Sequence, residues 1–380
     1  MQKYILADKN YDAFKRYLGT LNCKRALLVH GKSMVNLTVG QVLLRLPDFL
    51  GIDVIEFTDF TSNPDIESAI KGSKLCCAAD CDLIIACGGG SAIDVAKCIR
   101  LFRELDTGND NFFENLLPGK IPFVVIPTTA GTGSEATHFA VIYKDGQKLS
   151  LGEKGNIPQA VLWDTEVLCS LPLKQKRSTY FDAFCHAVES YWSVKATEES
   201  KIYAAEALRL LLTAGEDYLG GNSCERSNML MLLAANYAGR AINISKTTAA
   251  HAMCYKLTGM FGLPHGQAAA LCLDVLWRYM ISISQNKNMV SLNSVWTEIA
   301  DIMGENNVSL CVDRFHKMLC KYDQIPAWQI TDRANVIDTL AKSVNTERLQ
   351  NHPLKLEQSD FRNLYGQLFN EVGEGWNDED

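Results

Sequence analysis

One carboxylate and three imidazoles in the C-terminal half of this sequence have types and spacing that suit a metal ion. Asp182 and His186 lie four residues apart in FDAFCHAVESYW, so a helix would place both on one face. His251 and His265 follow in the mostly apolar segment ISKTTAAHAMCYKLTGMFGLPHG. An Asp–His pair alone is more often a hydrogen bond, and a lone buried histidine is usually a satisfied polar group. The four together form a mixed oxygen and nitrogen set suited to Fe(II) or Zn(II).

Two glycine-rich loops in the N-terminal half form a second candidate site. CGGGSAID follows one apolar run and precedes a helical pattern, and PTTAGTGSEAT follows another apolar run. Glycines let backbone N–H groups approach a diphosphate, and a helix N-terminus adds partial positive charge. Ser91 could cap that helix or bind a phosphate oxygen. A tight structural turn also explains the first loop, which is not G-x-G-x-x-G, but two such loops after strands together predict nucleotide binding.

The elements that must position these residues change character along the chain. Apolar runs rich in β-branched residues alternate with helical patterns in the segments Arg25–Ser33, Gly51–Phe57, Cys81–Ile99 and Ile121–Thr137, which predicts a parallel sheet covered on both faces. His138–Leu151 predicts a β-hairpin around an Asp-Gly turn. From about Pro172 onward, segments such as IYAAEALRLLLTAGEDYL predict amphipathic helices. We therefore predict an α/β domain at residues 1–168 and an all-α domain at residues 169–380.

The composition excludes several classes of protein. The 380 residues are 47% hydrophobic and 21% charged, which suits two globular domains. The net charge of −7 argues against nucleic acid as the main partner, although one site can still bind a small anion. No apolar run is long enough to span a membrane and no signal peptide is evident, so we expect a cytoplasmic protein without a membrane partner. The 13 cysteines are odd in number and lack paired C-x-x-C modules, so we expect reduced structural thiols, with a reactive or metal-binding thiol as the alternative.

Four motifs carry a resemblance to a known family: GGGSAID (Gly88–Asp94), PTTAGTGSEAT (Pro127–Thr137), DAFCH (Asp182–His186) and the His251…His265 pair that ends in PHG. With these motifs in this order, the chain resembles the iron-dependent (group III) alcohol dehydrogenases. The resemblance implies a dinucleotide-binding α/β domain, a helical metal-binding domain in a dehydroquinate synthase-like architecture, and a homodimer or larger assembly. Carried over by position, it implies the metal ligands Asp182, His186, His251 and His265 and the dinucleotide contacts Gly89, Gly90, Ser91, Asp94, Thr128, Thr129 and Lys148.

The implied chemistry is reduction of a small aldehyde to a primary alcohol, in which a metal acts as Lewis acid and NAD(P)H supplies the hydride. Two departures from the family concern the catalytic site. Where many relatives have a second histidine four residues after the third ligand, this chain has Tyr255, which could relay a proton, bind substrate or simply pack in the core. The usual glycine-rich approach to that ligand is here SKTTAAH, so Lys246, Thr247 and Thr248 predict an anion pocket; the alternative is that Lys246 points to solvent.

Substrate and cofactor follow from these departures. The segments ATHFAVIYKDGQKLSL and INISKTTAAHAMCYKLTGMFGLPHG look most like the branch that reduces phosphonoacetaldehyde to 2-hydroxyethylphosphonate, in phosphonate metabolism. NAD-preferring relatives tend to place Asp where this chain has Gly31, and Lys32 and Ser33 could bind a 2′-phosphate, so we expect NADP(H) to be favoured over NAD(H), with contacts from Gly31 and Ser33. The alternatives are a general short-chain alcohol or polyol dehydrogenase of the same family, or a non-catalytic nucleotide-binding protein.

Overall fold

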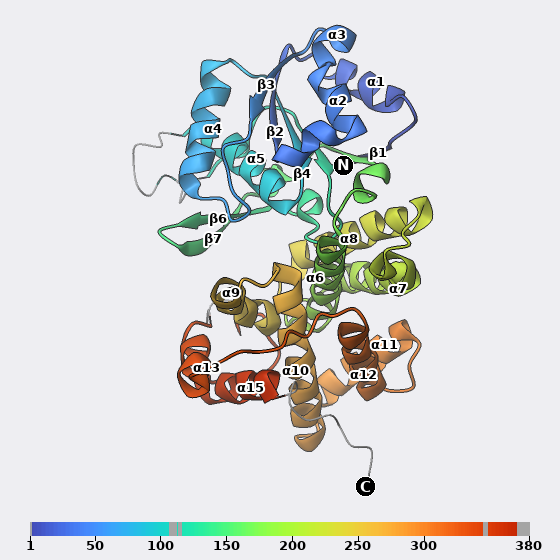
Figure 1. Ribbon diagram of the computed structural model, residues 1–380, viewed down its shortest axis with the longest axis vertical. Helices are drawn as coiled ribbons and strands as arrows, with labels where there is room; N and C mark the ends of the chain where they lie inside the picture. The colour runs from blue at the N-terminus through green and yellow to red at the C-terminus, as the bar shows by residue number, and fades with distance from the viewer. Residues whose placement is uncertain (1, 106–111, 113–115, 345–348, 371–380) are drawn as a thin grey trace. The chain divides into compact units, whose positions relative to one another are not determined.

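The computed structural model of the chain describes residues 2–105, 112, 116–344 and 349–370 (Figure 1). The chain divides into two compact units, Met1–Leu171 and Pro172–Asp380. The first contains the strands and the second is helical, as the alternating and then purely helical patterns predicted. Each unit is described by itself.

The first unit is built on a six-stranded parallel sheet with the strand order β1-β8-β5-β4-β2-β3. Its strands are β1 (Lys3–Leu6), β2 (Arg25–His30), β3 (Asp53–Phe57), β4 (Leu83–Gly88), β5 (Phe123–Pro127) and β8 (Ala160–Trp163). Every residue of the central strands β4 and β5 is buried, because helices cover both faces of the sheet. This confirms the parallel sheet that the continuous apolar runs predicted.

Five helices of the first unit connect its strands: α1 (Asp12–Thr20), α2 (Thr38–Leu44), α3 (Leu46–Leu50), α4 (Ile66–Ala78) and α5 (Gly90–Phe102). Right-handed crossovers place α1 to α3 on one face of the sheet and α4 and α5 on the other (Figure 1). The chain therefore leaves the neighbouring strands β2 and β4 toward opposite faces. Such a switch point opens a crevice at the carboxyl ends of the two strands.

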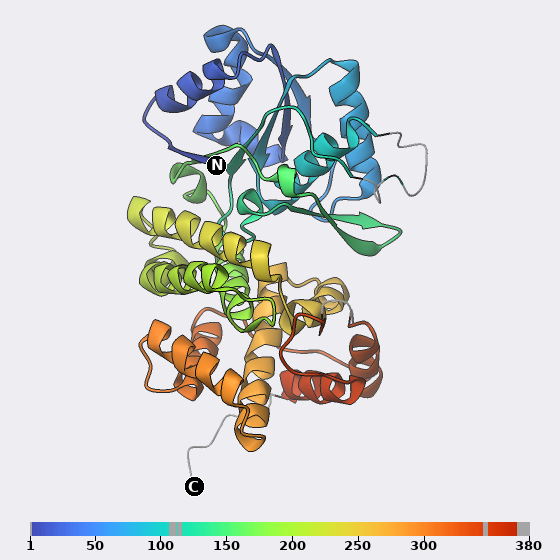
Figure 2. The same cartoon turned by 180° about the vertical axis from the view of Figure 1, so that it is seen from behind.

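The predicted hairpin consists of β6 (Phe139–Lys144) and β7 (Gln147–Gly152). Its two loop residues, Asp145 and Gly146, both have positive φ, at 51° and 73°. Two left-handed residues form the turn whose twist matches a two-residue hairpin, so the Asp-Gly signal is confirmed. The hairpin projects from the six-stranded sheet in both Figure 1 and Figure 2.

The second unit consists of helices, several of which pack around α6. They are α6 (Leu173–Trp192), α7 (Glu198–Gly220), α8 (Glu225–Ser245), α9 (Ala249–Phe261), α10 (His265–Asn286), α11 (Val290–Met303), α12 (Val308–Lys321), α13 (Arg333–Lys342) and α15 (Gln358–Asn370). Helices α7, α8 and α10 surround α6, in which every residue from Ser178 to Trp192 is buried. A helix enclosed on all sides is expected to be apolar all round, yet this one carries Asp182 and Glu189. Buried carboxylates need partners, and those partners define the candidate site.

Within the described part of the chain, none of the helices combines the length and the apolar character that crossing a membrane requires.

Candidate metal centre and loop cluster

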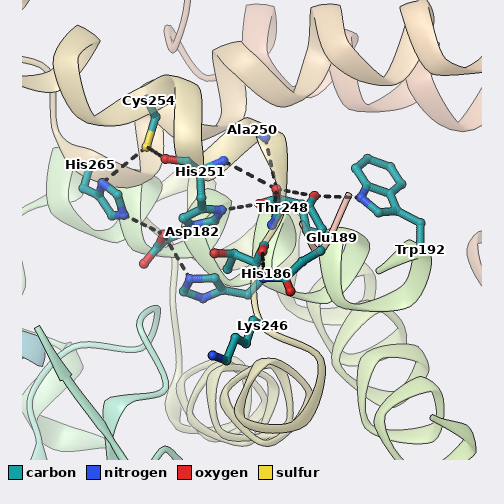
Figure 3. Close-up of polar contacts among 12 residues, drawn as sticks. Asp182, His186, Glu189, Trp192, Lys246, Thr248, Ala250, His251, Cys254 and His265 are labelled. Carbon is teal, nitrogen blue, oxygen red and sulfur yellow. Dashed lines mark hydrogen bonds and ion pairs between the residues drawn. The ribbon is translucent and has the colours of Figure 1, made fainter. Parts of the chain in front are cut away.

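Four residues of the second unit converge in what we call the histidine cluster: Asp182, His186, His251 and His265 (Figure 3). Asp182 and His186 come from α6, His251 is the third residue of α9, and His265 is the first residue of α10. Asp182 Oδ1 lies 3.8 Å from His186 Nε2, 3.5 Å from His251 Nε2 and 3.8 Å from His265 Nε2. The structure therefore brings together all four residues that the resemblance named as ligands.

The PHG sequence explains how α10 reaches the cluster. Gly262 ends α9 with φ of 64°, and Pro264 stands immediately before the first residue of α10. Gly266 then packs directly on α6: a Cβ at this position would lie 1.9 Å from the Ser178 carbonyl oxygen. Only glycine permits this approach, so the glycine sets how close His265 comes to Asp182.

The donor set of the histidine cluster fits a divalent ion. Asp182, His186 and His251 are buried, and their ligand atoms lie within 4.8 Å of one another. Metal–ligand bonds of about 2.1 Å in a tetrahedral site place the ligand atoms about 3.4 Å apart, close to the separations observed here. Asp182 Oδ1 and His251 Nε2 are buried and lack a hydrogen-bond partner in the protein. An ion coordinated by both atoms would satisfy them, which a purely structural packing of these side chains does not.

The electrostatics of the cluster also favour a cation. Burial by itself would raise the pKa of Asp182, but the imidazoles of His186, His251 and His265 hold it below its usual range. Burial by itself would lower the pKa of His251, but Glu189 and Asp182 raise it to about 9. Two buried carboxylates thus stabilise positive charge at this point, which a divalent ion would supply.

Glu189 is a residue of the candidate site that the sequence analysis missed. It is fully buried on α6, and its Oε1 accepts hydrogen bonds from Thr248 Oγ1 (2.7 Å), Thr248 N (3.0 Å) and Ala250 N (3.1 Å). Its Oε2 contacts His251 Nδ1 (Figure 3). Glu189 therefore caps the first turn of α9 and holds the imidazole so that Nε2 faces Asp182. Its position three residues after His186, on the same helix face, was the available signal.

The expectation that Thr248 contributes a hydroxyl to an anion pocket is wrong. Thr248 is fully buried, and its hydroxyl donates to Glu189 and accepts from Trp192 Nε1 at 2.9 Å. Its neighbour Thr247 is anchored as well, because its carbonyl accepts a hydrogen bond from Asn351 Nδ2 at 3.3 Å. The approach to His251 is thus a fixed segment, and Lys246 is the cationic residue in it.

Lys246 has an unusual backbone conformation. It follows the last residue of α8 with φ of 61° and ψ of 169°, a region that glycine alone adopts without strain. Its N–H donates to the Ile242 carbonyl at 2.9 Å, and its own carbonyl accepts from Ser245 Oγ at 3.2 Å. The side chain is exposed and is seen below His186 in Figure 3. A strained non-glycine residue next to a candidate site is a recognised mark of function.

Tyr255 and Cys254 lie against the fourth residue of the cluster. The Tyr255 ring stacks on the His265 imidazole, with centroids 5.8 Å apart and an interplanar angle of 5°. Cys254 Sγ lies 3.7 Å from His265 Nδ1. Tyr255 is half-buried, so its ring orients His265 while part of the side chain remains accessible. Cys254 was counted only as a core thiol in the sequence analysis.

The candidate nucleotide contacts of the first unit come from loops after β2, β4 and β5, which we call the loop cluster: Gly31–Ser33, Gly88–Ser91 and Pro127–Thr132. The last two touch one another, since Thr128 N donates to the Gly88 carbonyl at 3.0 Å. A Cβ on Gly89 would lie 3.1 Å from Thr129 Oγ1, and one on Gly90 would lie 2.9 Å from Thr132 Cγ2. Glycine thus lets these two loops pass closely, and backbone N–H groups can approach a ligand at this edge of the sheet.

Hydrogen bonds within the first unit hold the candidate contacts Ser91 and Asp94 next to these loops. Helix α5 begins at Gly90 with Gly89 as its N-cap, so the first of the two alternatives for Ser91, capping this helix, is wrong. The Ser91 hydroxyl donates to the Ser62 carbonyl at 2.6 Å. Asp94 accepts hydrogen bonds from Val141 N at 3.0 Å and from Ser134 Oγ, which ties α5 to the hairpin. Burial raises the pKa of Asp94, and Lys97 and Lys148 oppose that rise.

Gly31 and Ser33 lie at the start of the short η1 helix (Lys32–Asn36) after β2. A Cβ on Gly31 would meet nothing within 4 Å, and Ser33 is exposed. Both residues are therefore open to a ligand at the switch point between β2 and β4.

Comparison with known proteins places the chain in a family. The sequence family model of the iron-containing alcohol dehydrogenases matches residues 2–165. A second family model, for the C-terminal part of the Fe-containing alcohol dehydrogenases, matches residues 177–368. The chain belongs to the iron-containing alcohol dehydrogenase family. It is accordingly an oxidoreductase that acts on alcohols or aldehydes.

Three relatives show the range of the family around this chain. The 1,3-propanediol dehydrogenase of Citrobacter freundii is 32% identical over 298 residues, which cover 76% of this chain and 74% of the relative. The phosphonoacetaldehyde reductase of Streptomyces viridochromogenes is 27% identical over 327 residues, covering 81% of both chains. The crystal structure of sulfoacetaldehyde reductase from Bifidobacterium kashiwanohense in complex with NAD+ has a TM-score of 0.81 and 26% identity, covering 97% of both chains.

Proposed function

We propose that this protein is a metal-dependent NAD(P)H oxidoreductase that reduces a small anionic aldehyde to a primary alcohol, with phosphonoacetaldehyde, reduced to 2-hydroxyethylphosphonate, as the favoured substrate. Dinucleotide binding is assigned to residues 1–168, and metal binding and catalysis to residues 169–380. The observation that supports an anionic substrate is the position of Lys246, a cationic residue with a strained backbone five residues before His251.

Asp182, His186, His251 and His265 are the proposed ligands of Fe(II), with Zn(II) as the alternative. The convergent distances, the unsatisfied ligand atoms and the buried Glu189 behind His251 support this assignment. The ion would supply a Lewis acid for the carbonyl oxygen of the aldehyde. The protein's own contribution is to fix the ligand atoms through Glu189 and the close packing of Gly266.

The proposed cofactor contacts are Gly31, Ser33, Gly89, Gly90, Ser91, Asp94, Thr128, Thr129 and Lys148. The two touching loops and the N-terminus of α5 offer backbone donors for a diphosphate. Gly31 places no carboxylate where it would repel a 2′-phosphate, so we expect NADP(H) to be favoured over NAD(H). Comparable kcat/KM values with both cofactors would contradict that preference.

Lys246 and Tyr255 are the proposed substrate-side residues. The ammonium of Lys246 would pair with a phosphonate, and Tyr255, stacked on His265, would bind the substrate or relay a proton. Two of the relatives described above support an anionic aldehyde, because they are a phosphonoacetaldehyde reductase and a sulfoacetaldehyde reductase. A cytoplasmic homodimer or larger assembly stays a prediction.

The test is a screen of NADPH and NADH oxidation by the Fe(II)-loaded protein with phosphonoacetaldehyde, sulfoacetaldehyde and the neutral propionaldehyde. Lys246→Met should lower kcat/KM for phosphonoacetaldehyde by about tenfold to a hundredfold, the worth of one charge-assisted contact. The same variant should change kcat/KM for propionaldehyde less than about twofold. Lys287→Met is the matched control, because Lys287 also follows the last residue of a helix, at the far end of α10.

An equal effect of Lys246→Met on charged and neutral aldehydes would show that Lys246 does not select an anion. The second candidate, a general short-chain alcohol or polyol dehydrogenase, is favoured by the 1,3-propanediol dehydrogenase relative. It predicts a higher kcat/KM for propionaldehyde than for either charged aldehyde. Absence of turnover with any of these substrates in the metal-loaded protein would contradict both candidates.

A further inference from the structure

A second cluster of reactive side chains lies in the second unit, on helices α10 and α12. Cys320 Sγ is 3.5 Å from His316 Nε2, and His316 Nδ1 is 2.6 Å from Asp274 Oδ2. Cys320 and His316 are four residues apart on α12, so they share one face, and Asp274 lies on the adjoining helix α10 (Figure 1). The three side chains thus form a chain of contacts from thiol to imidazole to carboxylate.

Exposure to solvent increases from the carboxylate of Asp274 to the thiol of Cys320, as an activated thiol requires. Asp274 is buried at 2% exposure, the His316 side chain is 27% exposed, and Cys320 is exposed. A buried carboxylate that accepts the Nδ1 proton fixes the imidazole tautomer and leaves Nε2 as an acceptor facing the thiol. The imidazolium formed when the thiol gives up its proton is then stabilised by Asp274. Nucleophile, base and orienting carboxylate are the same three roles that activate cysteine in other proteins.

Neighbouring charges leave this arrangement intact. Arg278 Nε lies 3.7 Å from Asp274 Oδ1, and its Nη1 pairs with Asp313 at 2.7 Å. Lys321, beside Cys320 in the sequence, pairs with Glu216 of α7 at 2.7 Å. Arg278 and Lys321 are therefore each engaged with a carboxylate, and Asp274 is the acid in contact with His316.

We propose that Cys320 is a reactive thiol that undergoes exchange with small-molecule disulfides, with His316 as its base and Asp274 as the residue that orients the base. His316 Nε2 takes the proton of Cys320, and the thiolate attacks one sulfur of the disulfide. A new sulfur–sulfur bond joins Cys320 to that sulfur, the original disulfide bond breaks, and the other half leaves as a thiolate. The Cys320 sulfur is oxidised and the departing sulfur is reduced, so no further oxidant is needed. This site lies outside the histidine cluster and does not depend on the proposed substrate.

The chain contains its own comparison thiols. Cys77 and Cys169 are also exposed, but the acceptors beside them are backbone carbonyls, of Arg103 at 3.2 Å and of Thr165 at 3.8 Å. A carbonyl accepts the S–H hydrogen and so stabilises the thiol, whereas an imidazole base stabilises the thiolate. Burial moreover raises the pKa of Cys77.

The experiment exposes the metal-loaded full-length protein to a chromogenic aromatic disulfide and follows labelling of each cysteine by peptide mass spectrometry across a pH series. Cys320 should react at least about tenfold faster than Cys77 and Cys169 at neutral pH, because a larger fraction of it is thiolate. Its rate should persist at pH values where the other two have become slow. His316→Gln should bring Cys320 down to the rate of Cys77 and remove this difference in pH profile.

Two further variants test whether Cys320 depends on the contact between Asp274 and His316 or on any negative charge nearby. Asp274→Asn should slow Cys320, whereas Glu305→Gln, a change at a carboxylate that pairs with Arg314 and not with Arg278, should leave its rate unchanged. If Asp274→Asn fails to fold, His316→Gln still decides the question. A Cys320 that reacts no faster than Cys77 and Cys169, or that keeps its advantage in His316→Gln, overturns the proposal.

Discussion

The histidine cluster and the loop cluster are constructed in different ways. In the histidine cluster the groups that could do chemistry are side chains of α6, α9 and α10, three of them buried, and a further buried carboxylate holds one imidazole in place. In the loop cluster the candidate groups are mainly backbone N–H donors, and the key residues are glycines that have no side chain at all. The histidine cluster depends on the ligand atoms that its side chains supply. The loop cluster depends on glycines, whose missing Cβ atoms let the backbone come close to other groups.

The two clusters should therefore fail differently when they are mutated. Removing a ligand atom from the histidine cluster changes metal binding directly, whereas adding a methyl group to the loop cluster changes how closely two backbones approach. Metal content and nucleotide affinity are separate measurements, so each variant can be assigned to one cluster.

The largest effect is expected from Asp182→Asn. The change keeps the shape of the side chain but removes the anionic ligand atom that lies within 3.8 Å of all three imidazoles. Bound iron or zinc, measured by elemental analysis, should fall from one ion per chain to a small fraction, and kcat/KM should fall by at least about a thousandfold. Treatment of the wild-type protein with a chelator should reproduce the loss. Full metal content in the variant would show that Asp182 is not a ligand.

Glu189→Gln should weaken metal binding by about tenfold to a hundredfold, because an amide cannot hold the His251 Nδ1–H as the carboxylate does. Competition with a fluorescent chelator measures the affinity, and NADPH affinity should stay unchanged. Glu298→Gln is the control, since Glu298 is a carboxylate that contacts Tyr191 of α6 away from the cluster. Equal metal affinity in wild type and Glu189→Gln would show that Glu189 acts only as a cap of α9.

In the loop cluster, Gly90→Ala should weaken NADPH binding by about tenfold and leave metal content intact. The added Cβ would lie 2.9 Å from Thr132 Cγ2, so the two loops must separate. The double variant Gly90→Ala with Thr132→Ser removes that methyl group and keeps the hydroxyl that accepts from Ser134 N, so part of the affinity should return. Fluorescence titration with NADPH gives both values. No recovery in the double variant would mean that the clash is not the cause.

The smallest effect concerns stability. Lys246→Gly should raise the free energy of unfolding by about 1 kcal/mol relative to Lys246→Ala, because glycine adopts φ of 61° and ψ of 169° without strain and alanine does not. Thermal unfolding of the two variants measures the difference, and both lack the ammonium, so charge does not enter. Equal stabilities would remove backbone strain as an argument for the importance of Lys246.

Sequence reasoning succeeded where a local pattern has one physical meaning. The Asp145–Gly146 dipeptide predicted the hairpin turn because both residues tolerate positive φ. The buried runs at β4 and β5 predicted a parallel sheet because only such strands are apolar on both sides. Asp182 and His186 could be paired from their spacing on α6. Of the two roles considered for Ser91, the cap is excluded because the helix begins two residues earlier, within the usual uncertainty of a helix boundary.

The sequence could not show which side chains from different helices meet. Glu189, Thr248 and Asn351 come from distant segments, and their hydrogen bonds exist only because α6, α9 and the segment before α15 pack together. For the same reason Thr248 looked available for an anion when it is already bonded to Glu189 and Trp192. The contact of His316 with Asp274 likewise crosses from α12 to α10.

By itself, the sequence determined the residue types that can bind a metal and a nucleotide, and the order of strands and helices that carries them, because both follow from local spacing and periodicity. Tertiary structure alone decided that three histidines converge within 3.8 Å of one Asp182 oxygen, that a buried glutamate orients one of them, and that Lys246 takes a backbone conformation suited to glycine. These features depend on long-range packing, which no local pattern encodes.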